Sequence, residues 1–486
     1  MGEWIVRHRA VPFTEPFAWT RWGAPYYAYS WLAESLYYVL FKAGGLFALR
    51  VLHGIALAAS LLSVWFLGRC ARWTDWARLA AAAGTIWVYL IVASYLRPQE
   101  FLFTLVPLAW AFGYRILDSE HDWRSSAAGL VVVNAIAANV HLFFVLCALP
   151  VWLILALPLP RLQRWRVGAL VVAPIVGWLL TPYALVWPAV FRLYFAPNPL
   201  MRWPSVIAEL RPGAQAMLSS PAIIPAILLL AVLPWTLNVL RLGMSRRETW
   251  VFGALWTAGA FTFAWALRLV VVWWFAALPL TGFVLAVIPI ARTRGLRLGR
   301  IITACFIVLA PAIRLGILHQ LDLRSSAIPM KTVETERSLQ VEVASVLDPL
   351  VARLQGEPAS CGNRIMTAFN LGSYLTWRLP GYSVSVDSRG IFPDSVVLPE
   401  AFRTTDDGPE VYGAWRTADL AIIPLSFRLA SVLDTTTGWR HVTTALGARD
   451  RTSSDTTHRG GVGLWVRQPR DSCIEVRQSP PVLKLN

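Results

Sequence analysis

Charged residues are scarce in this sequence of 486 residues. They make up 15% of the chain, against about 25% in an ordinary soluble domain. Cysteine is scarce too, with 5 residues, whereas hydrophobic types reach 56% and tryptophan alone contributes 25 residues. The mean hydropathy is +0.52. This composition excludes a disordered chain, a small disulfide-stabilised protein and an ordinary cytosolic enzyme.

The common sequence motifs of soluble enzymes are also missing. The chain has no P-loop, no dinucleotide-binding glycine pattern, no His-Glu-x-x-His and no Gly-x-Ser-x-Gly. Its 7 histidines follow no metal-ligand spacing. These absences argue against a metal hydrolase and against an ATP-driven pump.

The positive charge lies in the apolar part of the chain. Residues 1–318 hold 26 basic and 10 acidic residues, whereas residues 319–486 hold 18 of each, so the net charge of +16 belongs entirely to the first part. A nucleic-acid-binding protein would instead carry a basic stripe on a soluble domain. We therefore expect no nucleic-acid partner.

Apolar segments long enough to cross a bilayer recur along residues 45–318. A membrane-spanning helix needs about 20 apolar residues, although the stretch 126–160 accommodates only two short spans. We expect about ten spans, in a polytopic α-helical membrane protein, at 45–69, 79–95, 100–117, 126–140, 142–159, 167–186, 221–242, 248–266, 269–290 and 301–318.

The loops between these segments alternate in charge. Five loops hold 15 arginines, and the loops between them hold 5. Cytoplasmic loops carry an excess of Lys and Arg, so the arginine-rich set is expected in the cytoplasm. Ten spans then place both termini outside it. Membrane lipids are the first expected partner.

The polar regions flank this apolar block. Residues 1–44 are expected to form an external or interfacial loop with an amphipathic helix at 30–42, which ends at Gly44-Gly45. Residues 45–318 form the transmembrane domain, and residues 319–486 form an extracytoplasmic α/β domain. Its expected elements are a helix over 334–354 and strands over 382–387, 420–424 and 461–466.

Two cysteines flank the polar C-terminal region. An extracytoplasmic position would permit Cys361 and Cys473 to form a disulfide. Two free thiols are the alternative.

Carboxylates are rare in the apolar part, and none falls in the middle of a predicted span. Glu100 is placed at the outer edge of one span. Coupled transporters usually carry an intramembrane carboxylate, so this pattern argues against that class.

The external polar residues suit a different chemistry. Sugar transfer from a lipid phosphate needs a base for the acceptor hydroxyl and positive charge for the departing phosphate. Glu15 and Glu34 are the candidate bases, and Arg97, His141 and Arg268 are the candidate phosphate-binding residues. Each has a structural alternative. Glu15 could be a solvated turn residue, and Glu34 could only make its helix amphipathic. Arg97 and Arg268 could reach lipid headgroups, and His141 could be a buried, hydrogen-bonded helix contact.

Short motifs in a fixed order resemble a known family. They match bacterial multi-spanning membrane proteins of the GT-C glycosyltransferase superfamily, which use lipid-linked sugar donors. The matching residues are Gly2–Ile5, Val11–Phe17, Trp31–Glu34, Gly44-Gly45, Arg97–Gln99, Asn139–His141, Thr181–Tyr183, Phe369-Asn370, Tyr374–Gly381 and Val386–Arg389. The resemblance implies a place in the bacterial cytoplasmic membrane and a polyprenyl-phosphate sugar as donor substrate.

The chain departs from the family pattern in two ways. Family members begin with one more membrane helix and an Asp-rich external stretch, and the family's Asp before Pro-Phe is Glu15 here. We expect a glycosyltransferase that moves a sugar to an extracytoplasmic glycan, lipid or protein acceptor. Its need for a divalent metal stays open. A non-catalytic membrane subunit or lipid-binding protein is one alternative, and a lipid or sugar transporter is another.

Overall fold

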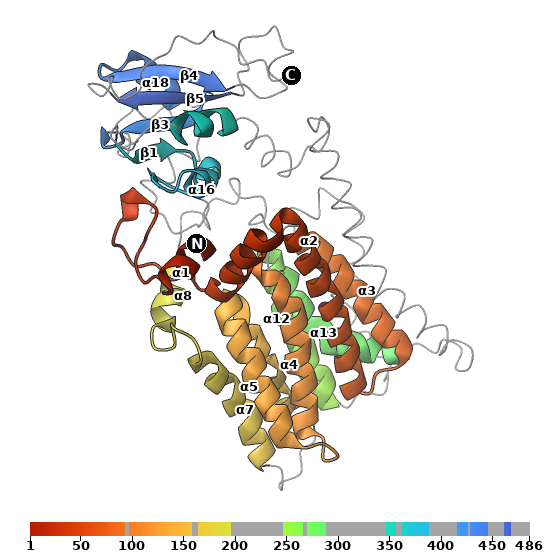
Figure 1. Cartoon of the computed structure of the whole chain (residues 1–486). Coiled ribbons are helices and arrows are strands. Elements are labelled where there is room, and N and C mark those ends of the chain that lie inside the picture. Colours follow the sequence, from red (N-terminus) through yellow and green to blue (C-terminus); the bar gives the residue numbers. More distant parts are fainter. Residues whose placement is uncertain are drawn as a thin grey trace. The chain divides into compact units, whose positions relative to one another are not determined.

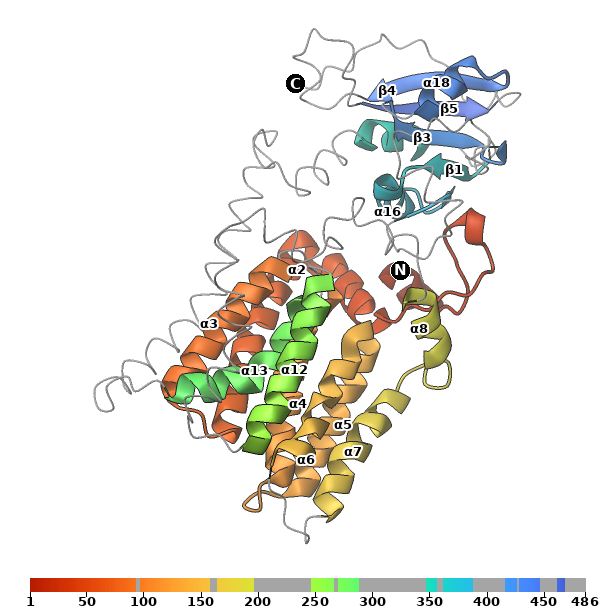
Figure 2. The same cartoon turned by 180° about the vertical axis from the view of Figure 1, so that it is seen from behind.

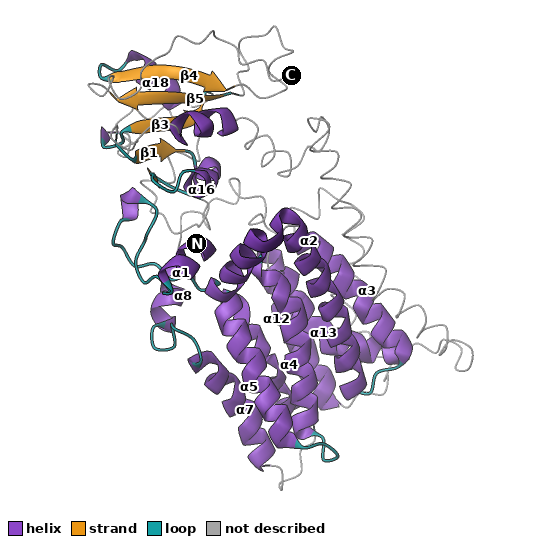
Figure 3. Ribbon diagram, in the orientation of Figure 1, coloured by secondary structure: helices purple, strands orange, loops and turns teal. Residues whose placement is uncertain are grey.

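The computed structural model describes residues 1–92, 97–157, 164–195, 246–265, 270–287, 347–355, 362–387, 416–425, 428–445 and 461–467. The described chain is mostly helical, with one small sheet near its C-terminus (Figure 1, Figure 3). It divides into two compact units. The helical unit includes Met1–Val11 and Tyr27–Val190, and the sheet unit includes Pro12–Tyr26 and the described residues after 320.

The helical unit is a bundle whose long helices run side by side (Figure 1, Figure 2). Its longer helices share apolar contact faces, with α4 packed between α2 and α5, and α5 packed between α4 and α7. The elements are α1 (Gly2–His8), α2 (Trp31–Cys70), α3 (Asp75–Val92), η2 (Pro98–Phe101), α4 (Leu102–Leu117), α5 (Trp123–Val140), η3 (Leu142–Trp152), α6 (Leu153–Ala156), α7 (Arg164–Leu179), α12 (Arg246–Trp265) and α13 (Val270–Val287), with α8 (Trp187–Phe195) at the boundary between the units.

Helix α2 consists of two segments joined by a kink. Gly44 and Gly45 depart from helical geometry, and Gly45 has φ 59° and ψ −149°, which suits glycine because it has no Cβ. The first segment starts at Trp31, so the helix predicted for 30–42 is confirmed, as is its interruption at the two glycines.

The run predicted as a span over 142–159 is an apolar helix over Leu142–Ala156, most of it in 3₁₀ geometry. His141 is extended, and the chain then forms the 3₁₀ helix η3 and the single turn α6. Pro150 contributes to this result, because it removes a backbone donor from the middle of the run. The helix predicted over 167–186 also ends earlier, at Leu179, two residues before Thr181-Pro182. The predicted spans 221–242 and 301–318 lie outside the described residues.

The outward face of α7 is apolar. Its exposed residues after Gly168 are Val171, Val172, Ile175, Val176 and Leu179, which recur at helical spacing. On the opposite face, Trp178 donates a hydrogen bond to the buried Asn134 of α5 at 2.9 Å. The outward face of α7 is therefore as apolar as its buried face, which consists of Leu170, Ala173, Pro174 and Gly177.

Two described stretches are long and apolar enough to cross a membrane. They are α2 itself, Trp31–Cys70, and the continuous η2–α4 stretch, Pro98–Leu117.

The sheet unit contains five strands in the order β2-β1-β3-β5-β4. Strands β2 and β3 pair in parallel with β1, and β5 pairs antiparallel with both β3 and β4. The elements are β1 (Arg364–Thr367), α16 (Phe369–Arg378), β2 (Ser383–Val384), β3 (Leu420–Pro424), α18 (Arg428–Thr435), β4 (Trp439–Ala445) and β5 (Val462–Arg467), with η1 (Trp19–Arg21) from the N-terminal part.

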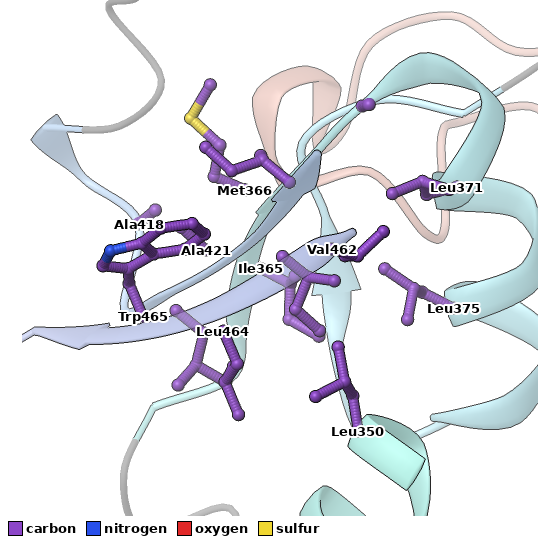
Figure 4. Close-up of a cluster of buried hydrophobic side chains, with 14 of the residues drawn as sticks. Leu350, Ile365, Met366, Leu371, Leu375, Ala418, Ala421, Val462, Leu464 and Trp465 are labelled. Carbon is purple, nitrogen blue, oxygen red and sulfur yellow. The ribbon is translucent and has the colours of Figure 1, made fainter. Parts of the chain in front are cut away.

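Buried side chains from the strands and helices form one core in this unit. Figure 4 shows Ile365 and Met366 of β1 and Leu464 and Trp465 of β5 beside helix residues such as Leu375. The strand predicted at 420–424 is confirmed, and that at 461–466 is confirmed with a shift of one residue. Only Ser383–Val384 of the strand predicted at 382–387 pairs in the sheet, and the described part of the helix predicted at 334–354 begins at residue 347.

An N-terminal segment extends this sheet. The edge segment, Pro12–Tyr26, belongs to the sheet unit, and its Ala18 forms a parallel bridge with Val384 of β2. Trp19 and Thr20 donate side-chain hydrogen bonds to the carbonyls of Ile365 and Ser385. The edge of a sheet offers unpaired backbone groups, and the edge segment occupies them.

Candidate functional site

Most of the predicted site residues that the structure describes lie in the helical unit. Glu34 is in the first segment of α2, Arg97 immediately precedes η2, and His141 lies between α5 and η3. Asn139, two residues before His141, accepts a hydrogen bond from the Trp31 indole at 2.6 Å. This bond fastens the start of α2 to the end of α5.

The amide of Asn139 is fully used by its surroundings. Its nitrogen donates to the carbonyls of Ala135 at 2.7 Å and Leu180 at 2.8 Å. Asn139 therefore joins three parts of the bundle: α2, α5 and the turn after α7. The family-like motif around it is explained by this structural role, because a buried amide needs all of its partners.

The geometry around His141 determines its protonation state. The backbone N–H of Phe143 donates to His141 Nδ1 at 3.1 Å. A nitrogen that accepts such a bond carries no proton, so the ring is neutral with its proton on Nε2. His141 is buried, and the ring of Tyr29 meets it edge-on with the centroids 5.9 Å apart.

The carboxylate of Glu34 is held from one side. Ser30 Oγ donates to Glu34 Oε1 at 2.8 Å, whereas Glu34 Oε2 is buried and has no hydrogen-bond partner among the described residues. Its charge acts on the hydroxyls of Tyr37 and Tyr183. Helix α1 covers this turn, since a Cβ on Gly2 would lie 2.0 Å from the Glu34 carbonyl oxygen. A buried carboxylate oxygen that accepts no hydrogen bond can accept a proton.

A buried cluster next to these residues was missed at the sequence level. Glu100 is fully buried, and its Oε2 lies 2.5 Å from His53 Nδ1 on the second segment of α2. Tyr37 donates to Glu100 Oε1 at 2.9 Å, and Tyr89 of α3 donates to Oε2 at 3.2 Å. The sequence did not indicate that Glu100 is buried, because the burial comes from α2 and α3, which fold over it. Only the rarity of acids in apolar sequence pointed to it.

Glu15 lies in the other unit. Its Oε1 accepts hydrogen bonds from the backbone N–H groups of Phe17 at 2.8 Å and Ala18 at 3.0 Å. The side chain is buried, with 2% of its surface exposed, so it is not the solvated turn residue that was the alternative. The structure therefore gives Glu15 a shaping role in the edge segment.

The structure does not test the other predicted site residues. Arg268, Cys361 and Cys473 lie outside the described residues. Among the described residues, no group of three or more His, Cys, Asp or Glu side chains is arranged to hold a metal ion.

The charged loops gather at the opposite end of the bundle. Arg72 of the α2–α3 turn lies 3.6 Å from Asp118 and 3.7 Å from Glu120 in the α4–α5 turn. Arg166, at the start of α7, donates to the carbonyl of Ile116 at 3.1 Å. Three of the loops predicted to be cytoplasmic are therefore neighbours, and the Glu34 and His141 region is at the other end of the same helices.

Comparison of the chain with models of known protein families gives no match, and comparison with curated proteins gives none either. The site must therefore be interpreted from its own geometry.

Proposed function

We propose that this protein is a membrane glycosyltransferase, similar to the GT-C superfamily, which moves a sugar from a polyprenyl-phosphate donor to an extracytoplasmic acceptor. The observation that carries the proposal is that Glu34 and His141 lie on elements joined by the Trp31–Asn139 hydrogen bond, at the end of the bundle opposite the arginine-rich turns. Side chains at the end of a bundle that lies in a bilayer can contact the phosphate of a lipid-linked donor.

The apolar exterior of α7 supports a bilayer environment. A helix that turns Val, Ile and Leu outward and asparagine inward is stable in lipid, where the hydrocarbon core solvates the outer face. The arginine-rich turns at one end then face the cytoplasm under the positive-inside rule. This orientation places Glu34 and His141 on the extracytoplasmic side.

The edge segment supports the same topology. Segments that share a β-bridge must lie on the same side of any membrane that the chain crosses. The bridge between Ala18 and Val384 therefore requires that the N-terminal loop and the C-terminal domain share one compartment. An even number of spans between them satisfies this requirement, as in the predicted ten.

The chemistry that we assign to the site is a direct displacement. Glu34 takes the proton of the acceptor hydroxyl, whose oxygen bonds to the anomeric carbon of the sugar as the bond from that carbon to the phosphate oxygen breaks. The lipid phosphate leaves with its electron pair, and we assign its stabilisation to the Nε2–H of His141 and the guanidinium of Arg97. The predicted role of Glu15 as the base stays a prediction, tested in parallel.

The test is sugar transfer in lipid nanodiscs with a panel of labelled polyprenyl-phosphate sugars. Glu34→Gln should lower kcat by about 10²-fold or more, because a positioned base contributes that much. Glu120→Gln is the matched control, since Glu120 is an exposed carboxylate at the other end. Wild-type turnover in Glu34→Gln contradicts the assigned base. Wild-type protein that binds the donors without turnover contradicts the enzyme and favours a lipid-binding subunit.

One observation favours a second candidate, a coupled transporter. The buried Glu100–His53 pair is a carboxylate site of the kind that coupled transporters carry, and the sequence did not reveal it. Uptake of lipid-linked sugar into sealed proteoliposomes, driven by a pH gradient, would support this candidate, whereas transfer without translocation would support the enzyme.

A further inference from the structure

Glu100 connects the two segments of α2 through its two oxygens. Oε1 accepts from Tyr37 in the first segment, and Oε2 contacts His53 in the second segment, beyond the kink at Gly44 and Gly45. Glu100 and His53 retain 0% and 3% of their surface. The buried Glu100 carboxylate therefore joins the two helix segments on either side of the kink, and this bridging carboxylate is called the clasp.

The charge of this clasp has only one counterpart among the described residues. A buried carboxylate is costly unless it is paired and hydrogen-bonded. Its single ion-pair partner in the described chain is His53, which is charged only when it is protonated. Tyr37 and Tyr89 are neutral donors. Glu34 adds a further negative charge that acts on Tyr37.

The hydrogen bonds of the cluster leave the protonation of one atom, His53 Nε2, open. Tyr37 donates to Oε1, and the Tyr89 hydroxyl lies within hydrogen-bond distance of Oε2, of His53 Nδ1 and of the His53 carbonyl. The 2.5 Å contact between His53 Nδ1 and Glu100 Oε2 requires one further proton between these two atoms. His53 Nε2 is buried and has no hydrogen-bond partner in the described chain. The cluster has charge −1 if Nε2 is bare and charge zero if Nε2 carries a proton.

We propose that His53 and Glu100 form an internal proton-binding site of the helical unit, with His53 Nε2 as the atom that gains and loses the proton. The ligand is a proton delivered by water: a hydronium ion protonates Nε2 and leaves a water molecule, and no other bond changes. The neutral imidazolium–carboxylate pair is the form favoured in an apolar surrounding, because it has no net charge. This inference goes beyond sugar transfer and does not depend on it.

Occupancy of this site bears on α2 as a whole. When Nε2 is protonated, Glu100 faces an imidazolium and grips the second segment more firmly. When Nε2 is bare, the cluster keeps a net negative charge. This charge and the negative charge of Glu34 both act on Tyr37, and they repel each other. Tyr37 from the first segment and Tyr89 from α3 contact the pair directly, Glu34 acts on Tyr37, and the apolar ring of Phe103 of α4 lies against Tyr89.

The test is ¹⁵N-histidine NMR of the full chain in lipid nanodiscs between about pH 5 and about pH 9. The His53 signal is assigned by its loss in His53→Gln, and independently by contact with the Tyr89 ring, whose centroid lies 5.3 Å away. We expect Nδ1 to stay protonated throughout, while Nε2 changes from protonated to bare as the pH rises. In Glu100→Gln the midpoint of that change should fall by about one pH unit or more, because the paired charge is gone.

Control variants separate this site from general effects. Glu120→Gln should leave the His53 midpoint unchanged, since its carboxylate is exposed at the arginine-rich end. Tyr37→Phe removes one donor and should raise the midpoint, which keeps the test decisive where Glu100→Gln does not fold. A His53 ring that keeps one state over the whole range overturns the proposal, as does a midpoint that is the same in wild type and in both cluster variants. Loss of sugar transfer in Glu34→Gln with an intact His53 titration separates this result from the proposed function.

Discussion

The Glu15 carboxylate shapes the edge segment from within. It accepts the backbone N–H groups of Phe17 and Ala18, and the next residues, Trp19 and Thr20, bond to the strands. The same oxygen therefore fixes the turn and aligns the chain with β2. A role in transfer would be added to this structural role.

Removal of that oxygen should loosen the edge segment. Glu15→Ala leaves two buried N–H groups without an acceptor, at a cost of about 1–3 kcal/mol for each unsatisfied group. Glu15→Gln keeps an acceptor and should cost less than about 1 kcal/mol. Hydrogen exchange of peptides from residues 12–26 measures the effect, and equal protection in wild type and Glu15→Ala would contradict it.

At the residue level, the sequence indicated the polar residues of one end of the bundle and missed the buried cluster. Asn139 and His141 stood out because polar residues between apolar runs are unusual. Glu100 was assigned by its distance from a hydropathy boundary. Its burial depends on His53 and Tyr89, which are far from it in sequence and brought to it only by packing.

At the level of elements, helix α16 shows how closely the sheet unit is packed. A Cβ on Gly372 would lie 1.8 Å from the carbonyl oxygen of Val386, so the helix lies directly on the backbone that follows β2. Only glycine permits this approach.

Gly372→Ala should therefore destabilise the sheet unit by about 1–3 kcal/mol or more, the range for an overpacked core. Gly381→Ala is the matched control, because nothing lies within 4 Å of a Cβ at that position. The control should stay within about 0.5 kcal/mol of wild type. Denaturant midpoints followed by tryptophan fluorescence test this, and equal midpoints for the two variants would refute the packing explanation.

The hydroxyl of Tyr374, also on α16, links this helix to residues 347–355. Burial raises the pKa of Tyr374 to about 12, and its hydrogen bond to the Asp348 carboxylate adds to the effect. A raised pKa in the folded state means that the unfolded chain loses this proton first. The stabilisation is therefore complete below about pH 10 and declines as the pH rises toward about 12.

Tyr374→Phe should remove this decline. The wild type should lose more protection in peptides from residues 364–384 between about pH 9.5 and about pH 11.5 than the variant does. Hydrogen exchange, corrected for the intrinsic rate at each pH, measures the difference. A parallel decline in both proteins would exclude Tyr374 as its source.

The elements themselves were predictable to different degrees. The run over 420–424 is short, apolar and fully buried, and it forms β3. Strand β4 was missed because its burial follows no clear alternation, and its place depends on β5. The run 142–159 had the composition of a span, but Pro150 and the His141 turn decided its geometry.

At the scale of the molecule, the charged turns and the edge segment are two independent observations that bear on the topology of the chain. The turns around Arg72 and Asp118 meet at one end of the bundle. Asp122 caps α5 there, and the backbone N–H groups of Arg124 and Ser125 hold the pKa of its carboxyl below the usual range. The edge segment joins two parts of the chain that are far apart in sequence.

Single-cysteine labelling should reveal two sides. Cysteines that replace Trp22 and Ser431, both exposed in the sheet unit, should react with a membrane-impermeant maleimide from the same side of sealed vesicles, and a cysteine that replaces Glu120 only from the other. The native cysteines are first changed to serine. Labelling of positions 22 and 431 from opposite sides would contradict the shared β-bridge.

The pairing of Trp19 with Ile365 spans 346 residues of chain. A ribosome that adds about 5–20 residues per second needs roughly 20–70 s to synthesise that interval. Throughout this time the N-terminal segment has no sheet to join, while every intervening helix is already being made. Completion of the sheet is thus a late step of biogenesis, and a nascent chain stopped before residue 364 would leave residues 12–26 exposed to proteases and chaperones.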